Sequence, residues 1–468
     1  MRNVVVIGAG PAGYVCAIRL AQLGQAVTVV EKEALGGTCL NVGCIPSKAL
    51  IAAGALMDKV KHASQMGVHV EGVRLDLEQL VKWKEGIVGK LTGGVGGLLK
   101  NHKVAHIAGT AKILGKNKVE VTKAKGDTQV LECDDIVIAT GSVASTIPGF
   151  EFDGKHVWSS TEALAPDRVP DHLVVIGGGY IGLELGMLYR KLGSEVTVIE
   201  FTEGALPGQD RDCVKIIERS MKKMGMKMLT RTGAKSWEKK GDKLLVTAES
   251  RDGKRQTIEC DQILCTVGRT PFSEGLGLES VGLSTVKPGF LEVDAQRRTK
   301  VPNIYAIGDI AGQPMLAHKG SKEGLVAAAV IAGQPEEYDV RCVPAVIFTA
   351  PEMSSVGLQE AEAKEAGHDV KVGQFPFAAS GRAMSLMETD GFVKIIADAK
   401  TDEVLGVHMV GPEVTELIAE AALAIEMRAT VEDLARTIHA HPTLPEVVME
   451  AAEAVHSMAV HIFQKPTK

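Results

Sequence analysis

The sequence predicts an α/β fold in which one strand–turn–helix–strand unit occurs twice, ahead of a C-terminal α+β domain. Residues 5–31 and 174–200 share one pattern of apolar residues, glycines and a final acid, and they align without a gap. Residues 132–141 and 259–268 also resemble each other, and each reads as a strand that closes its unit. Two internal repeats in the same order therefore indicate one architecture used twice.

Length and composition support a globular chain of several domains. The 468 residues exceed what one hydrophobic core usually serves. Hydrophobic residues make up 45% and charged residues 24%, as in ordinary globular proteins. The net charge of -6 is mild, and the basic residues are scattered among acids. This pattern argues against a nucleic-acid-binding protein.

The start of the chain predicts a buried strand. Met1 and Arg2 lead directly into a short apolar stretch that ends in a glycine motif, which favours a strand over a signal peptide. No apolar run reaches the roughly 18 residues of a membrane helix, so we expect no membrane span. We therefore expect a cytoplasmic protein. In a reducing compartment, paired members of its eight cysteines would be catalytic rather than structural.

Each repeat carries a Gly-x-Gly-x-x-Gly motif between a strand and an apolar-periodic helix. Such glycines permit a tight turn and a close approach to a pyrophosphate, which the helix N-terminus attracts, while the final acid accepts hydrogen bonds from a ribose. Glycine-rich turns without a ligand are the alternative, and two complete copies favour Rossmann-like dinucleotide-binding domains. The residues concerned are Gly8, Gly10, Gly13 and Glu31 in the first copy, and Gly177, Gly179, Gly182 and Glu200 in the second.

Four segments are predicted from these patterns. The two dinucleotide-binding domains cover about 1–147 and 148–273. A central piece covers 274–342, where a buried strand ends in a glycine and an acid and a helical pattern follows. The remainder, 343–468, mixes strand-like stretches with an Ala/Glu-rich helix and reads as a separate α+β domain.

Two cysteine pairs have the same spacing, so spacing alone does not identify a reactive pair. Cys260 and Cys265 fall on a predicted strand, where five residues span about 16 Å, whereas a disulfide tolerates about 7 Å between Cα atoms. Cys39 and Cys44 could be bridged only at a distorted turn, because a regular helix puts them on different faces. Gly43 permits such a turn. Two free core thiols or a metal site remain alternatives, although no second Cys/His cluster has ligand spacing and we expect no metal.

The residues around this pair carry a family resemblance. Residues 36–48, Gly-Gly-Thr-Cys-Leu-Asn-Val-Gly-Cys-Ile-Pro-Ser-Lys, resemble the active-site signature of the flavin disulfide reductases. Further similar motifs lie at 139–141, 267–271, 307–309 and 439–443, so the resemblance extends over essentially the whole chain. Members of this family reduce glutathione disulfide or mercuric ion, or oxidise dihydrolipoamide.

The resemblance implies FAD on the first domain, completed by 274–342, and NAD on the second. An ion pair between Lys48 and Glu184 beside the flavin is also implied. The FAD residues would be Gly8, Gly10, Gly13, Glu31, Thr38, Lys48, Gly141, Asp309 and Ala317, with Ala317 at the edge of the flavin ring. The NAD residues would be Gly177, Gly179, Gly182, Glu184, Glu200 and Gly268.

The catalytic roles also follow from the resemblance. Cys44 would face the flavin and Cys39 would exchange with substrate sulfur, with His441 as the base that Glu446 orients. His439 is an alternative base, and both histidines could instead be ordinary packed or capping residues. The family places this histidine in the partner subunit's site, which implies a homodimer formed through 343–468.

The choice of substrate rests on two features. Glu200 favours NAD over NADP, because a carboxylate there repels a 2′-phosphate. The tail after Cys342 lacks the extra cysteine pair typical of mercuric reductases. We therefore expect oxidation of dihydrolipoamide by NAD+, with a lipoyl-bearing acyltransferase or a glycine-cleavage carrier protein as partner. A glutathione- or mercuric-reductase-like activity, or mainly a docking role in a multienzyme complex, are the alternatives.

Overall fold

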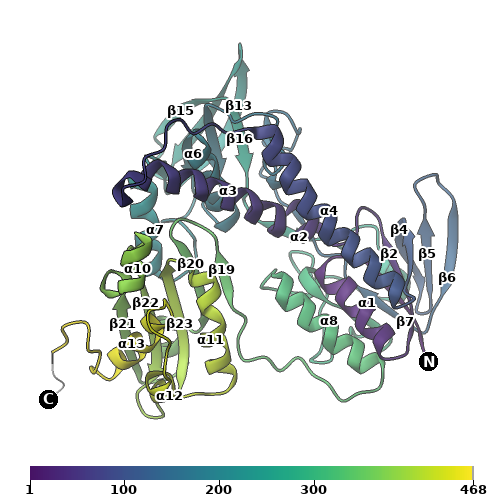
Figure 1. Cartoon of the computed structure of the whole chain (residues 1–468). Helices are drawn as coiled ribbons and strands as arrows, with labels where there is room; N and C mark the ends of the chain where they lie inside the picture. The colour runs from purple at the N-terminus through teal and green to yellow at the C-terminus, as the bar shows by residue number, and fades with distance from the viewer. Residues whose placement is uncertain (466–468) are drawn as a thin grey trace. The chain divides into compact units, whose positions relative to one another are not determined.

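The chain forms two compact units (Figure 1). The computed structural model describes residues 1–465. The first unit contains Met1–Val169 and Cys265–Asp339. The second contains Pro170–Leu264 and the described residues from Val340 onward. One copy of the sequence repeat therefore lies in each unit.

A parallel sheet with strand order β18-β7-β1-β2-β3 forms the core of the first unit. Its central strand is buried on both faces, as the continuous apolar run in the sequence predicts. Strand β18 comes from the central segment of the chain and pairs with β7. The strands are β1 (Asn3–Ile7), β2 (Ala26–Glu31), β3 (Ala105–Ala108), β7 (Asp135–Ile138) and β18 (Ile304–Ala306).

Helices α1 (Pro11–Gln22) and α8 (Ala317–Ile331) lie side by side in this unit (Figure 1). Glycines make the close contact possible. A Cβ atom at Gly324 would lie 2.7 Å from the carbonyl oxygen of Ala12, and one at Gly320 would lie 3.1 Å from the Ala12 Cβ. The contact holds the first turn of α1, which contains Gly13, the last residue of the first glycine motif.

The other elements of the first unit surround this core. Helix α2 (Gly37–Val42) leads into α3 (Cys44–His62), which packs against α4 (Leu77–Asn101). An antiparallel sheet joins β4 (Thr110–Gly115), β5 (Lys118–Thr122) and β6 (Thr128–Glu132). Short elements complete the unit: η1 (Ala63–Met66), β8 (Ser142–Ala144), β9 (Val157–Trp158), α5 (Ser160–Ala163), β17 (Arg269–Pro271), η2 (Leu278–Val281) and η3 (Gly308–Ala311).

One helical segment bears on the prediction about membranes. Within residues 1–465, the helical segment 37–66 is long and apolar enough, by length and composition only, to cross a membrane. Charged residues interrupt the segment, so it contains no uninterrupted apolar run of the length that the sequence analysis required. The segment is divided at Gly43, where α2 ends and α3 begins. A core helix passes the same test, so one such segment is weak support for a membrane span.

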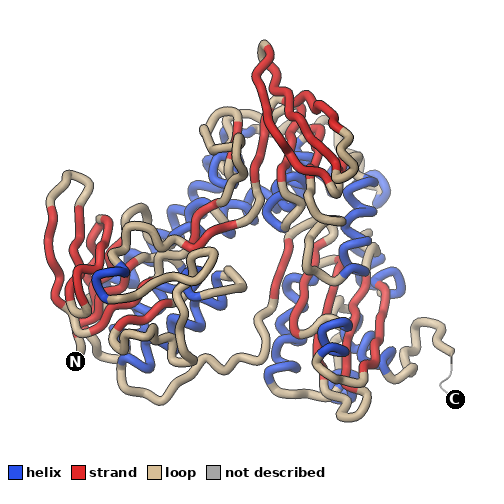
Figure 2. Tube along the Cα trace, turned by 180° about the vertical axis from the view of Figure 1, so that it is seen from behind, coloured by secondary structure: helices blue, strands red, loops and turns tan. Residues whose placement is uncertain are grey.

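The second unit contains the second sequence repeat. Its strands have the order β12-β11-β10-β16, in which β10, β11 and β12 are parallel, and α6 (Tyr180–Leu192) packs on β10 and β11. Helix α7 (Arg211–Lys223) follows β11. Antiparallel strands β13 to β15 project from this unit (Figure 2). The strands are β10 (His172–Ile176), β11 (Glu195–Ile199), β12 (Lys227–Leu229), β13 (Thr232–Lys240), β14 (Lys243–Ser250), β15 (Arg255–Cys260) and β16 (Gln262–Cys265).

The C-terminal part of this unit is a mixed α/β structure. Its antiparallel sheet has the order β19-β20-β23-β22-β21, and α11 (Val414–Glu426) and α13 (Glu446–Val455) pack on it. The strands are β19 (Ala345–Ile347), β20 (Glu352–Gly357), β21 (Val370–Pro376), β22 (Phe392–Asp398) and β23 (Val404–Gly411). Short helices are α9 (Glu360–Glu365), η4 (Phe377–Ala379), α10 (Gly381–Leu386) and α12 (Val431–Arg436).

The second cysteine pair lies in the core, but not on one strand as predicted. Cys260 ends β15 and Cys265 ends β16, because the chain breaks between these strands at Asp261. Both thiols are free and buried, so the prediction of a core role for Cys265 is confirmed. Burial raises the pKa of Cys260 to about 12, which disfavours a reactive thiolate.

The close packing of α1 and α8 generates a stability prediction. Gly324→Ala should lower the free energy of unfolding by about 1–3 kcal/mol, because the new methyl group would meet the Ala12 backbone. Gly94→Ala on α4 is the matched control. It has open space around its Cβ position and should stabilise the protein by up to about 1 kcal/mol through helix propensity. Urea unfolding followed by circular dichroism measures both, and equal stability of the two variants would contradict the packing.

Candidate active site

The first glycine motif forms a turn that leaves room for a ligand. Gly8 has a φ of 101°, and a Cβ there would lie 2.3 Å from the carbonyl oxygen of Ala139. Gly10 is the N-cap of α1, carries no side-chain cap, and has no atom within 4 Å of its Cβ position. A Cβ at Gly13 would lie 2.0 Å from the Gly8 carbonyl oxygen. Gly8 and Gly13 are thus required by packing, whereas the space at Gly10 fits a pyrophosphate at a helix N-terminus.

Glu31 holds this turn from the end of β2. One carboxylate oxygen accepts a hydrogen bond from the Ala9 amide at 2.7 Å, and the other accepts from the Glu33 amide at 2.8 Å. The side chain is therefore fixed beside the turn. Each oxygen has a second lone pair with which it can accept from a ribose hydroxyl.

The second copy reproduces this geometry. Gly177 has a φ of 103°, and the Cβ position of Gly179, the N-cap of α6, is open. Glu200 is buried and accepts from the Gly178 amide at 2.5 Å and the Thr202 amide at 2.7 Å. Gly182 is buried within α6. Both turns therefore combine an open N-cap glycine with a fixed carboxylate, and the binding of a dinucleotide by these residues stays a prediction.

A break between two helices brings Cys39 and Cys44 together. Helix α2 ends and α3 begins at Gly43, where a Cβ would lie 2.9 Å from the Thr38 carbonyl oxygen. The distorted turn predicted at Gly43 is confirmed. Both cysteines are thiols, and their side chains share a hydrogen bond. Cys44 is exposed and Cys39 is half-buried against the core.

The surroundings of Cys39 determine its acidity. The Cys39 thiol donates a hydrogen bond to the Cys44 sulfur, and this bond, together with burial, raises the pKa of Cys39. Lys48, one turn further along α3, acts in the opposite direction by favouring the thiolate. A positive charge close to two vicinal sulfurs is the setting that stabilises a thiolate once one forms.

Glycines connect the cysteine segment to the first nucleotide turn. The Gly36 amide donates to the Ala9 carbonyl oxygen at 2.8 Å. Gly37 has a φ of 56°, and a Cβ there would lie 2.6 Å from the Gly10 Cα. The redox pair and the open Gly10 turn are therefore held together within one unit.

Asp309 is held by residues that the sequence analysis did not single out. Its carboxylate accepts from the Ser142 hydroxyl at 2.5 Å, and the Ser142 oxygen accepts from Arg269 Nε at 2.7 Å. Gly141 precedes Ser142 with a φ of 70° and an open Cβ position. Arg269 lies in the motif 267–271, which the sequence analysis noted for its family resemblance. The contact of Arg269 with Ser142 was not predicted.

A buried charge network supports the same turn from α8. Glu323 accepts from the Gly308 amide at 2.7 Å and pairs with Arg297 at 2.9 Å and Lys319 at 3.2 Å. Ala317, predicted at the flavin ring edge, is the first residue of α8. The N-terminus of this helix has no side-chain cap. The positive end of the helix dipole is suited to an electron-rich group.

Two predicted cofactor residues need separate mention. Glu184 is buried in α6 and accepts from the Phe348 amide at 2.8 Å. It belongs to the second unit and Lys48 to the first, so their ion pair stays a prediction. Gly268 has a φ of 127° and belongs to the first unit, whereas the other predicted NAD residues belong to the second.

The two histidines of the C-terminal motif have different surroundings. His441 Nδ1 lies 2.8 Å from a Glu446 oxygen, and 81% of its side chain is exposed. The His439 side chain is only 5% exposed and lies between Glu420 and the Thr437 carbonyl oxygen, each at 2.8 Å. Only His441 thus presents a ring that a reacting group can reach, which favours it as the base.

The comparisons with known proteins agree with this site. The pyridine nucleotide-disulphide oxidoreductase family model matches residues 2–324, and the dimerisation domain model of the same family matches 343–452. A dihydrolipoyl dehydrogenase of Haloferax volcanii is 48% identical over 99% of this chain and 98% of its own. One of Thermus scotoductus is 49% identical over 99% of both chains.

Solved structures show the same architecture. The crystal structure of LpdA from Mycobacterium tuberculosis has a TM-score of 0.91 and 30% identity, covering 97% of this chain and 99% of its own. The flavoprotein disulfide reductase RclA of Escherichia coli has a TM-score of 0.86 and 26% identity, covering 96% and 99%. With two nucleotide turns, a vicinal thiol pair and these matches, the chain belongs to the pyridine nucleotide-disulphide oxidoreductase family.

Proposed function

We propose that this protein oxidises dihydrolipoamide to lipoamide and passes the electrons through FAD to NAD+. The observation that carries the proposal is the contact between the Cys39 and Cys44 thiols at the Gly43 break, next to an open nucleotide turn. The substrate assignment is supported by full-length relatives that are named dihydrolipoyl dehydrogenase.

The cysteine pair exchanges electrons with the substrate dithiol. With Cys39 and Cys44 joined as a disulfide, one substrate thiolate attacks Cys39 and releases the Cys44 thiolate. The second substrate thiolate then attacks the mixed disulfide, which releases lipoamide and the Cys39 thiolate. Two electrons have passed to the pair, and Lys48 stabilises the negative charge left on its sulfurs.

His441 takes the proton from the substrate. The thiolate is the attacking species, so a base must remove a proton from the incoming dithiol. Glu446 holds Nδ1 of the ring and leaves Nε2 to accept that proton. The Thr443 amide donates to the second Glu446 oxygen at 2.8 Å, which fixes the carboxylate in turn. The dimerisation domain supports a homodimer, in which this histidine would serve the partner subunit's cysteine pair.

FAD and NAD would occupy the two glycine turns. Gly10 and Glu31 would hold the FAD pyrophosphate and ribose, with Gly141, Asp309 and Ala317 nearer the flavin. When bound, FAD supplies the two-electron chemistry that links a dithiol to a nicotinamide. Glu200 would accept the ribose hydroxyl of NAD and repel a 2′-phosphate. Overall, dihydrolipoamide and NAD+ give lipoamide, NADH and one proton.

The partners and location follow from this activity. A lipoyl group carried by an acyltransferase or by a glycine-cleavage carrier protein would bring the dithiol to the site. We propose a cytoplasmic enzyme that serves such a complex. A purely docking role would leave the thiol pair and both open glycine turns without use.

A panel of substrates tests the proposed function. The purified protein should be yellow and should reduce lipoamide with NADH at least tenfold more efficiently than oxidised glutathione or mercuric ion with either nucleotide. The reason is the acid at Glu200 and the absence of a basic group beside it in the sequence up to Arg211. Steady-state kcat/KM for each pair measures this. Preference for NADPH with glutathione would overturn the substrate assignment. A colourless protein that takes up no FAD would favour a docking role in a multienzyme complex.

Matched histidine variants test the base. His441→Gln should lower kcat for dihydrolipoamide oxidation by about 10²–10⁴-fold, as expected when a general base is lost. His439→Gln should keep kcat within about threefold and lower thermal stability instead, because it removes a buried contact with Glu420. Equal losses of activity in the two variants would contradict the assignment.

Glu446→Gln should lower activity by the same factor at each pH, without adding a new ionisation to the pH profile of the activity. Burial opposes charge on Glu446, but hydrogen bonds from the Thr443 amide and His441 hold its pKa below the ordinary value. A depressed carboxyl pKa means that the group is charged at every pH above about 5. The loss of activity should therefore be uniform between pH 6 and 9. A loss confined to one end of that range would show that Glu446 titrates there.

A further inference from the structure

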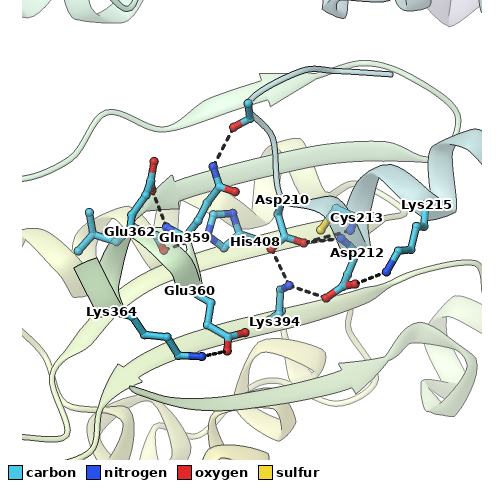
Figure 3. Close-up of polar contacts among 12 residues, drawn as sticks. Asp210, Asp212, Cys213, Lys215, Gln359, Glu360, Glu362, Lys364, Lys394 and His408 are labelled. Atoms are coloured by element: carbon cyan, nitrogen blue, oxygen red, sulfur yellow. Dashed lines mark hydrogen bonds and ion pairs between the residues drawn. The ribbon is translucent and has the colours of Figure 1, made fainter. Parts of the chain in front are cut away.

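A buried lysine of the C-terminal sheet reaches the nucleotide-binding half of the second unit (Figure 3). Lys394 lies on β22 and is only 3% exposed. Its Nζ lies 2.6 Å from Asp210 Oδ2 and 3.0 Å from Asp212 Oδ2. Neither carboxylate is on the sheet, since both lie at the start of α7. One cation thus joins the C-terminal sheet to the first turn of α7.

Asp210 also caps the N-terminus of α7, so its contact with Lys394 is linked to the start of this helix. It is the N-cap of α7, and its Oδ1 accepts from the Asp212 and Cys213 amides, both at 3.1 Å. The helix N-terminus favours both carboxylates, and Asp212 also pairs with Lys215 at 2.9 Å. The Asp210 carboxylate therefore ties the helix start to Lys394.

Lys394 is the cation that pairs with Asp210, whereas the exposed Lys215 pairs with Asp212, at 2.9 Å. His408 lies opposite Lys394 on the neighbouring strand β23, and its Nε2 is 3.0 Å from the Leu358 carbonyl oxygen. Burial lowers the pKa of His408, so the ring is neutral near pH 7. Removing the lysine charge would leave Asp210 buried without its cation, which is costly.

The chain from Asp210 back to Glu200 is held to the C-terminal domain as well. Gln359 Nε2 donates to the Gly208 carbonyl oxygen at 2.8 Å. Ser355 Oγ donates to Gln209 Oε1 at 3.3 Å. Residues 208–210 are thus fixed on the C-terminal domain by three successive contacts, and the Lys394 pair is the buried and charged one.

The other end of this segment holds the glycine turn. The Leu206 amide donates to the Gly178 carbonyl oxygen at 2.9 Å, and Glu200 accepts from the Gly178 amide. Both backbone groups of Gly178 are therefore bonded to the segment 200–210. Gly178 lies between Gly177 and Gly179, the turn assigned to the NAD pyrophosphate.

We propose that Lys394 is a positioning residue for nucleotide binding, which acts through Asp210 and the segment 200–210 on the Gly177–Gly179 turn. The C-terminal domain thus has a second role, because it sets the geometry of the NAD site of its own chain in addition to forming the dimer. This inference rests on the proposed function, which places NAD at that turn.

Lys394→Met tests the proposal, with Lys223→Met as the matched control. Lys223 also joins α7 to the C-terminal domain, through Asp390 at 2.7 Å, but both groups are exposed and lie at the far end of the helix. Lys394→Met should raise KM for NAD+ and the dissociation constant of NADH by about tenfold. Its KM for dihydrolipoamide should stay within about twofold. Lys223→Met should change none of these values, as expected of a surface pair.

Hydrogen exchange gives a readout that does not depend on activity. The Leu206 amide should exchange faster in Lys394→Met than in wild type, and it should be unchanged in Lys223→Met. If Lys394→Met does not fold, Asp212→Asn removes one partner, keeps the N-cap, and should raise KM for NAD+ about threefold.

The outcomes separate this inference from the proposed function. Unchanged nucleotide constants in folded Lys394 and Asp212 variants, beside a wild type that binds NADH, overturn the inference alone. An equal rise of KM for NAD+ and for dihydrolipoamide also overturns it, because it shows general destabilisation. A wild type that binds no NADH overturns the proposed function and this inference with it.

Discussion

The break in the backbone at Gly43 is the constraint on which the candidate site depends. A side chain there would lie against the Thr38 carbonyl oxygen, so glycine is needed where α2 ends and α3 begins. This break lets Cys39 and Cys44 share a hydrogen bond, which a continuous helix would prevent. The close approach of Gly37 to Gly10 then holds the pair next to the first nucleotide turn. Redox chemistry and cofactor binding are thereby combined in one unit.

The two nucleotide halves share one hydrogen-bonding scheme but differ in their support. In both, a carboxylate at the end of the second strand binds the amide after the first glycine, at Ala9 or Gly178. The first half is supported by α8, which packs closely on α1. In the second half, the segment after Glu200 is anchored in the C-terminal sheet through Lys394. The sequence repeat thus explains the common geometry of the two turns, and contacts with segments further along the chain explain their different support.

Local sequence patterns predicted the fold and much of the site, because glycines and acids at fixed spacing have one main physical use. The glycine turns, the acids and the Gly43 break were predictable in this way. Long-range contacts were not, since the contact of Ser142 with Asp309 and that of Lys394 with Asp210 join residues far apart in the chain. Cys260 and Cys265 were placed on one strand because the break at Asp261 has no glycine or proline to signal it.

The most direct test of the central claim is the redox state of each cysteine. Differential alkylation and peptide mapping should find Cys39 and Cys44 joined by a disulfide in the oxidised enzyme. Both should become free thiols after one equivalent of dihydrolipoamide per subunit, while Cys260 and Cys265 react equally in both states. Cys39 and Cys44 labelled to the same extent before and after reduction would contradict the account.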